Sequence, residues 1–161
     1  MLDSTVLEDI QSYLDLHLQI KSFAPLESEF IVSEMLNTTD LKSFIKTKRK
    51  PTLKNVLFTY IDKKGKTDAE IYKKAGLDRR HFSKIKNEPR YRPKKNTILT
   101  LAIALELQID ETEDLLNSAG YSLSQSETFD LIVQYFIENK MYDILLINEA
   151  LDHFEEKLLV E

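Results

Sequence analysis

Glycine is scarce in this chain, and that scarcity limits the folds it can adopt. Three glycines and four prolines occur in 161 residues, and no Asn-Gly or Asp-Gly pair marks a hairpin. Apolar residues instead recur at the spacing of one helix face, most clearly at Leu53, Val56, Leu57, Tyr60 and Ile61. No sustained alternation of apolar and polar residues indicates strands. The pattern therefore predicts an all-α fold.

Composition also argues against catalysis. The chain has no Cys, which excludes disulfides, thiolate metal sites and thiol nucleophiles. Three glycines cannot form a phosphate loop or a dinucleotide-binding fingerprint. The histidines, His17, His81 and His153, have no partner at the helical spacing of a metal site. We therefore expect no enzyme activity, no metal and no cofactor.

Hydropathy points away from membranes and export. No run of about 18 apolar residues occurs, and the N-terminus lacks the basic-then-apolar pattern of a signal peptide. We expect a soluble, cytoplasmic protein that has no membrane partner.

Positive charge is concentrated in the middle of the chain. The window from Lys46 to Lys95 contains 18 of the 22 Lys and Arg residues but 5 of the 27 Asp and Glu residues. The whole chain nevertheless has a formal charge of −5. Clustered cations on a compact helical unit attract the phosphates of nucleic acid, whatever the net charge of the chain.

The charge pattern divides the chain into three parts. Residues 1–45 form an acidic helical extension, with a capping box expected at Thr5 and Glu8 and a further helix from about Thr39. Residues 46–121 form the basic domain, entered through a basic linker or phosphate-contacting arm at 46–51. Residues 122–161 form an acidic pair of helices that could support dimerisation, the first of them capped by Ser124 and Glu127.

Two short helices joined by a tight turn lie within the basic domain. Thr67 and Glu70 predict a capping box that opens the first helix, and Gly76 suits the turn. Asp78 is the expected cap of the second helix, whose inward positions are Phe82 and Ile85. After Pro93 a further helix is expected from Thr97 to Leu105, and a shorter one begins at Asp110 or Thr112.

The segments Asp68 to Ile85 and Pro93 to Leu105 resemble the Cro/C-repressor type of helix-turn-helix, the xenobiotic-response-element-like family of phage and bacterial regulators. The resemblance covers residues 53–121. It implies a five-helix bundle, here with N-terminal and C-terminal helical extensions, whose third helix lies in the DNA major groove. It also implies a regulator of transcription, such as a repressor, that binds double-stranded DNA as a homodimer.

Helical geometry selects the residues that would contact DNA. With Phe82 and Ile85 facing the core, the outward face of their helix comprises the base-reading candidates Arg79, Arg80, Ser83 and Lys84. The phosphate-contacting candidates are Lys73, Lys74, Lys86, Arg90, Arg92, Lys94 and Lys95. Tyr91 could stack on a sugar or base, or could anchor its loop.

Some residues depart from the family pattern and support other readings. Tyr72 occupies a position where the two helices approach closely and Ala is usual, and Asp68 stands where Gln commonly contacts phosphate. These departures favour a protein-interaction module, such as an antitoxin, anti-repressor or defence-system adaptor. RNA binding is a further alternative, because phosphate attraction does not distinguish the two nucleic acids.

The C-terminal apolar stripe is open to two interpretations. Its residues, at spacings of three and four, are Ile144, Ile147, Leu151, Phe154 and Leu158. The stripe could be the seam of a homodimer, or it could pack on the protein's own helices.

Overall fold

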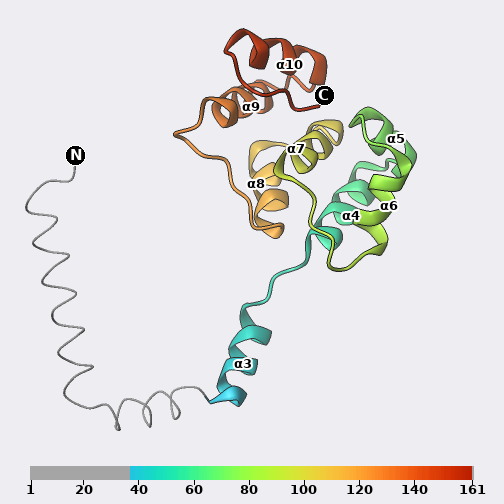
Figure 1. Ribbon diagram of the computed structural model, residues 1–161. Helices are drawn as coiled ribbons and strands as arrows, with labels where there is room; N and C mark the ends of the chain where they lie inside the picture. Colours follow the sequence, from blue (N-terminus) through green and yellow to red (C-terminus); the bar gives the residue numbers. More distant parts are fainter. Residues whose placement is uncertain (1–36, 161) are drawn as a thin grey trace, which may run out of the picture. The chain divides into compact units, whose positions relative to one another are not determined.

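The computed structural model describes residues 37–160, and the regular structure of that range is helical (Figure 1). The chain divides into two compact units, residues 1–49 and 50–161. The helices are α3 (Thr38–Lys48), α4 (Leu53–Lys64), α5 (Asp68–Lys74), α6 (Arg79–Asn87), α7 (Lys95–Ala104), α8 (Ile109–Ser118), α9 (Thr128–Glu138) and α10 (Ile144–His153). The predicted all-α class is confirmed for this range.

Helix α3, in the first unit, is capped by Asn37, whose side chain accepts a hydrogen bond from the Thr39 amide at 3.1 Å. The expected helix from about Thr39 is confirmed. It continues to Lys48, so the first residues of the expected basic linker are helical instead. The capping box expected at Thr5 and Glu8 lies outside the described residues.

The ends of α4, α5 and α6 follow from local sequence. Thr52 caps α4, and Gly65 ends it in the left-handed conformation with φ of 63°. Thr67 and Glu70 form the predicted capping box of α5. The side chain of Asp78 caps α6 by accepting a hydrogen bond from the His81 amide at 2.6 Å. Thr52, Thr67 and Asp78 each accept a hydrogen bond from a backbone amide that the helix leaves without a partner, whereas the Gly65 amide donates to carbonyls at the end of α4.

Helix α7 is the centre of the second unit. Seven consecutive residues, from Ile98 to Ala104, are buried. The helix packs against α5 on one side and α8 on another (Figure 1). A helix that is apolar all round must be covered on all sides, so α7 joins α5 to the rest of the core.

Helices α9 and α10 pack against the same core. Val133, Ile137, Ile147 and Leu151 are at most 2% exposed and belong to one apolar cluster with residues of α4 to α8. Residues 122–160 thus lie in one compact unit with the helices before them. The burial of Ile147 and Leu151 in their own chain confirms the second interpretation for these two residues, whereas Phe154 and Leu158 of the same stripe are 59% and 37% exposed.

The stripe also does not continue as one helix. Helix α10 ends at His153, and Glu155 has a positive φ of 58°. The chain then turns back, because Leu159 donates its amide to the Asn148 side chain at 2.9 Å and buries its own side chain. Val160 lies beside the turn glycine Gly76. The last residues therefore brace the turn between α5 and α6.

Two expected helix starts are wrong. The Ser124–Glu127 capping box does not form, because the Ser124 amide donates instead to buried Asp130 at 2.7 Å and α9 begins only at Thr128. Helix α8 begins at Ile109, since Gln108 and Glu111 form a capping box there. Between residues 37 and 160, no helix has the length and apolar character needed to cross a bilayer.

Candidate nucleic-acid interface

The four base-reading candidates lie together on the outer face of α6. Phe82 and Ile85 are 3% and 4% exposed and fix the inward side of the helix. A shallow groove follows the opposite side, lined by Arg79, Arg80, Ser83, Lys84, Asn87 and Glu88. The three cations are exposed and the Ser83 hydroxyl is half-buried. Because Phe82 and Ile85 face the core, all four base-reading candidates lie on the opposite side of α6.

Three contacts hold α6 in this orientation. Asp78 caps its first turn, as described above. In the same first turn, the Tyr91 hydroxyl lies 2.8 Å from His81 Nε2, and the two rings meet edge to face. Tyr91 is half-buried, so it anchors the loop that follows α6. That loop carries Arg90.

Tyr72 lies where α5 meets α6. Tyr72 is half-buried, and its ring packs against the Phe82 ring with centroids 5.7 Å apart. Phe58 of α4 meets the Phe82 ring edge to face, with centroids 5.9 Å apart. A second groove runs beside this cluster, and its lining includes Asp68, Tyr72, Arg79, Ser83 and Lys86. The bulk of Tyr72 is thus accommodated between the helices, next to the outer face of α6.

Lys86, a phosphate-contacting candidate, has partners within the protein. Its ammonium group lies 2.7 Å from Asp68 Oδ2 and 5.4 Å from the centroid of the Phe58 ring. An ion pair and a cation–π contact both draw the amine towards α4 and α5. The sequence placed Lys86 among the phosphate contacts and Asp68 where Gln commonly contacts phosphate, and it did not indicate that the two residues pair.

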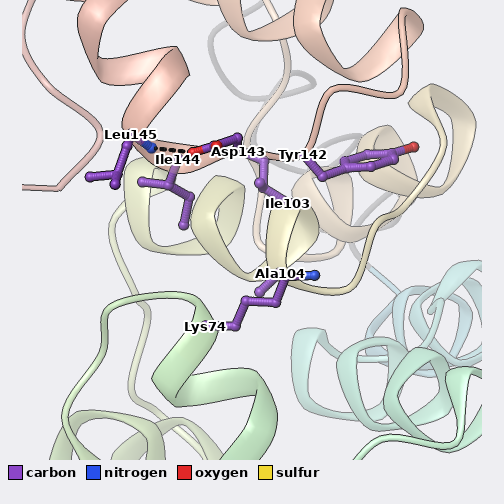
Figure 2. A pocket seen from close by; sticks show the side chains of 7 residues that line it. All are labelled: Lys74, Ile103, Ala104, Tyr142, Asp143, Ile144 and Leu145. Atoms are coloured by element: carbon purple, nitrogen blue, oxygen red, sulfur yellow. Dashed lines mark hydrogen bonds between the residues drawn. The ribbon is translucent and has the colours of Figure 1, made fainter.

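Lys74 lies at a different place, in a hollow between α5, α7 and the start of α10 (Figure 2). Its ammonium group is 2.7 Å from a carboxylate oxygen of Glu106. Lys74 lowers the pKa of Glu106, through a hydrogen bond first and its charge second. Burial raises the pKa of Tyr142, which lines the same hollow. Lys74 is therefore separate from the residues of the α6 groove.

Lys95 forms the most buried ion pair among residues 37–160. Its ammonium group lies 2.5 Å from Asp130 Oδ2, and the two side chains are 26% and 3% exposed. The same oxygen accepts the Ser124 amide. This pair ties the start of α7 to α9, which gives Lys95 a structural role.

Arg92 also has a role within the fold. Its guanidinium lies 4.5 Å from the centroid of the Tyr121 ring and donates to the Gly120 carbonyl at 3.3 Å. By contrast, Lys73, Arg90 and Lys94 are exposed and form no ion pair within residues 37–160. The seven phosphate-contacting candidates thus divide into four that have intramolecular partners and three that do not.

The cations of the α6 face also have no carboxylate partner within residues 37–160. Arg79, Arg80 and Lys84 form no salt bridge with any carboxylate in the described part of the chain. Glu88 is the acidic residue that shares their groove. No three potential metal ligands cluster within residues 37–160. The arrangement can bind an anion by charge and by hydrogen bonds from the guanidinium groups.

Comparison of the chain with protein-family models, with curated proteins and with solved structures finds no match. The candidate interface is therefore defined by its own geometry. Helix α6 is held by its cap and core contacts, and the cations on its outer face form no ion pair within residues 37–160.

Proposed function

We propose that this protein is a DNA-binding regulator of transcription, of the phage and bacterial type, which reads a duplex operator with α6. The observation that carries the proposal is the exposed face of Arg79, Arg80 and Lys84, which have no carboxylate partner within residues 37–160, whereas Lys74 and Lys86 do. Cations left unpaired on a rigid helix are free to pair with phosphates and base edges.

Arg79 and Arg80 are the proposed base readers. The major groove of B-DNA is wide enough to admit an α-helix, and a guanidinium can donate two hydrogen bonds to guanine O6 and N7. Ser83 and Lys84, on the same face, would make secondary contacts. The caps and core contacts of α6 favour this use, because a helix already held in place loses little freedom on binding.

Phosphate contacts would come first from Lys73, Arg90 and Lys94, which are exposed and unpaired within residues 37–160. Lys74, Lys86 and Lys95 would each have to leave a carboxylate before binding a phosphate. We therefore expect the salt dependence of binding to reflect fewer phosphate contacts than the number of candidates suggests.

A homodimer on a two-fold operator is part of the proposal. Its interface would use exposed apolar side chains of α10, such as Leu145 and Leu146 at 76% and 45% exposure, because Ile147 and Leu151 are already buried. Two copies would place their α6 helices in half-sites about one helical turn apart. Light scattering with and without operator DNA measures this stoichiometry.

Replacing Arg80 and Lys94 tests the base-reading assignment. Arg80→Ala should lower affinity for a selected operator by about 1–3 kcal/mol and leave random duplex nearly unaffected. Lys94→Ala should weaken all sequences alike, because a phosphate carries no sequence information. Binding isotherms on an operator selected from a random DNA pool, and on random duplex, separate the two effects.

Lys157→Ala is the charge-matched control. Lys157 is exposed and lines neither groove beside α6, so its loss should change both affinities little. If Arg80→Ala and Lys94→Ala weakened every sequence equally, α6 would not be reading bases.

A protein-interaction module is the second candidate function. It is favoured by the carboxylates that occupy Lys74, Lys86 and Lys95, and by exposed apolar side chains such as Leu145 and Tyr135. A gel shift with random duplex at low salt distinguishes the DNA-binding regulator from the protein-interaction module. Binding at micromolar protein supports DNA, and its absence supports the interaction module. Competition by structured and single-stranded RNA tests the RNA alternative.

A further inference from the structure

Asp68 and Lys86 form an ion pair at the edge of the candidate interface. The carboxylate comes from the first turn of α5 and the amine from the last turn of α6, with 2.7 Å between Nζ and Oδ2. Their side chains are 35% and 48% exposed. Both residues line the groove that also includes Arg79 and Ser83. The pair is therefore open to solvent beside two of the proposed base readers.

This pair affects the interface in two ways. It holds one cation against an internal carboxylate, and the Phe58 ring on the other side of the amine strengthens that hold. It also places a negative charge beside a face whose other charges are mostly positive, so an approaching phosphate meets both attraction and repulsion. Both effects lower affinity for a polyanion without altering the outer face of α6.

We infer that Asp68 limits the affinity of the α6 face for nucleic acid by holding Lys86 away from phosphate. This inference rests on the proposed function, since it concerns how tightly the same face binds. Lys86 is then a phosphate contact that becomes available only when its carboxylate partner is removed. The resulting gain is independent of sequence, because a lysine that contacts phosphate does not read bases.

The test is Asp68→Asn in the full chain, which removes the charge and keeps the shape of the side chain. Affinity for random duplex and for the selected operator should rise alike, by about threefold or more at low salt, a gain in the range of an exposed ion pair. One added phosphate contact should also steepen the slope of log K against log salt by about 0.9. Fluorescence anisotropy over a salt series measures both.

Two variants show where the gain comes from. Glu113→Gln also removes one carboxylate, but from an exposed position on α8, where Glu113 forms no ion pair within residues 37–160 and lines neither groove beside α6. It should raise affinity by less than about half as much as Asp68→Asn. In a Lys86→Gln background, Asp68→Asn should leave the salt slope unchanged, because no amine is released.

The outcomes separate this inference from the proposed function. Equal gains in Asp68→Asn and Glu113→Gln would mean a general effect of net charge and would overturn the inference. Unchanged affinity in Asp68→Asn, with Arg80→Ala still losing operator binding, would overturn the inference alone. If neither the native protein nor Asp68→Asn bound any duplex, both would fail. Asp68→Ser, also neutral and suited to a first helical turn, replaces Asp68→Asn if that variant unfolds.

Discussion

Thr112 is a polar residue in an apolar environment. It is fully buried in α8, and its Oγ1 has no hydrogen-bond partner among the described residues. Sequence reasoning proposed this residue as a helix start because threonine commonly caps helices. The capping box of Gln108 and Glu111 places the start earlier and carries Thr112 into the core.

Thr112→Val should leave the protein as stable or make it more stable, by up to about 1 kcal/mol, because it removes an unpaired buried hydroxyl at nearly constant shape. Urea unfolding followed by far-ultraviolet circular dichroism measures the change. Thr59→Val is the control, since the Thr59 hydroxyl is exposed and donates to the Asn55 carbonyl at 2.7 Å. A loss above about 1 kcal/mol in Thr112→Val would instead indicate a buried water bound to the hydroxyl.

At the scale of elements, α7 and α9 are joined by a polar contact inside an apolar core. Asp130 accepts from both the Lys95 ammonium and the Ser124 amide. Removing its charge leaves the amine three-quarters covered and unpaired. The sequence did not indicate this pairing, because Asp130 lies 35 residues further along the chain, and Lys95 was therefore predicted to contact phosphate.

Asp130→Asn should therefore lower the free energy of unfolding by about 2–3 kcal/mol, somewhat less than the loss expected when a fully buried pair is broken. Chemical denaturation measures the loss. Glu106→Gln breaks the exposed pair with Lys74 and should cost less than about 1 kcal/mol. Equal losses in the two variants would contradict the structural role of Lys95.

The start of α8 should make stability depend on pH. The Gln108 amide, and then Lys64 and Lys63, lower the pKa of Glu111 from its usual value of 4.5. A carboxyl whose pKa is lower in the folded state stabilises the protein above the unfolded value. That stabilisation is lost as pH falls through the folded value. Stability should therefore decline as pH falls below about 4.5.

Glu111→Gln tests this expectation. The variant should be less stable at pH 7, by about 1 kcal/mol for the weakened cap and ion pairs. It should also show a shallower decline in acid. Urea unfolding from pH 7 to about pH 3 gives both values. Glu113→Gln, an exposed neighbour on the same helix, serves as control. A parallel decline in native protein and Glu111→Gln would show that other groups dominate.

At the scale of the whole molecule, the second unit has one core to which α4 through α10 contribute. The charge pattern suggested a separate acidic part from residue 122, because acidic residues predominate there. Buried side chains of α9 and α10 nevertheless join the same apolar cluster as those of α7. Surface charge gives no information about which apolar faces meet.

A chain ending at Tyr121 should therefore lose its cooperative fold. The truncation removes Val133, Ile137, Ile147 and Leu151, each worth about 1.5–3 kcal/mol when buried, and together that approaches the whole stability of a small domain. Thermal unfolding followed by circular dichroism should show a weak, broad transition or none. A sharp native-like transition in the truncated chain would show that residues 122–161 form a separate unit.

The helices around the candidate site can be predicted from the sequence, because capping and helix periodicity act over a few residues. Thr67, Gly76 and Asp78 specify the turn, and Phe82 with Ile85 orients α6. Which cations are paired within residues 37–160 depends on how the helices pack. The carboxylates that hold Lys86, Lys74 and Lys95 lie 18, 32 and 35 positions away along the chain. Helix packing alone brings such distant charges together, and a charge count cannot detect that pairing.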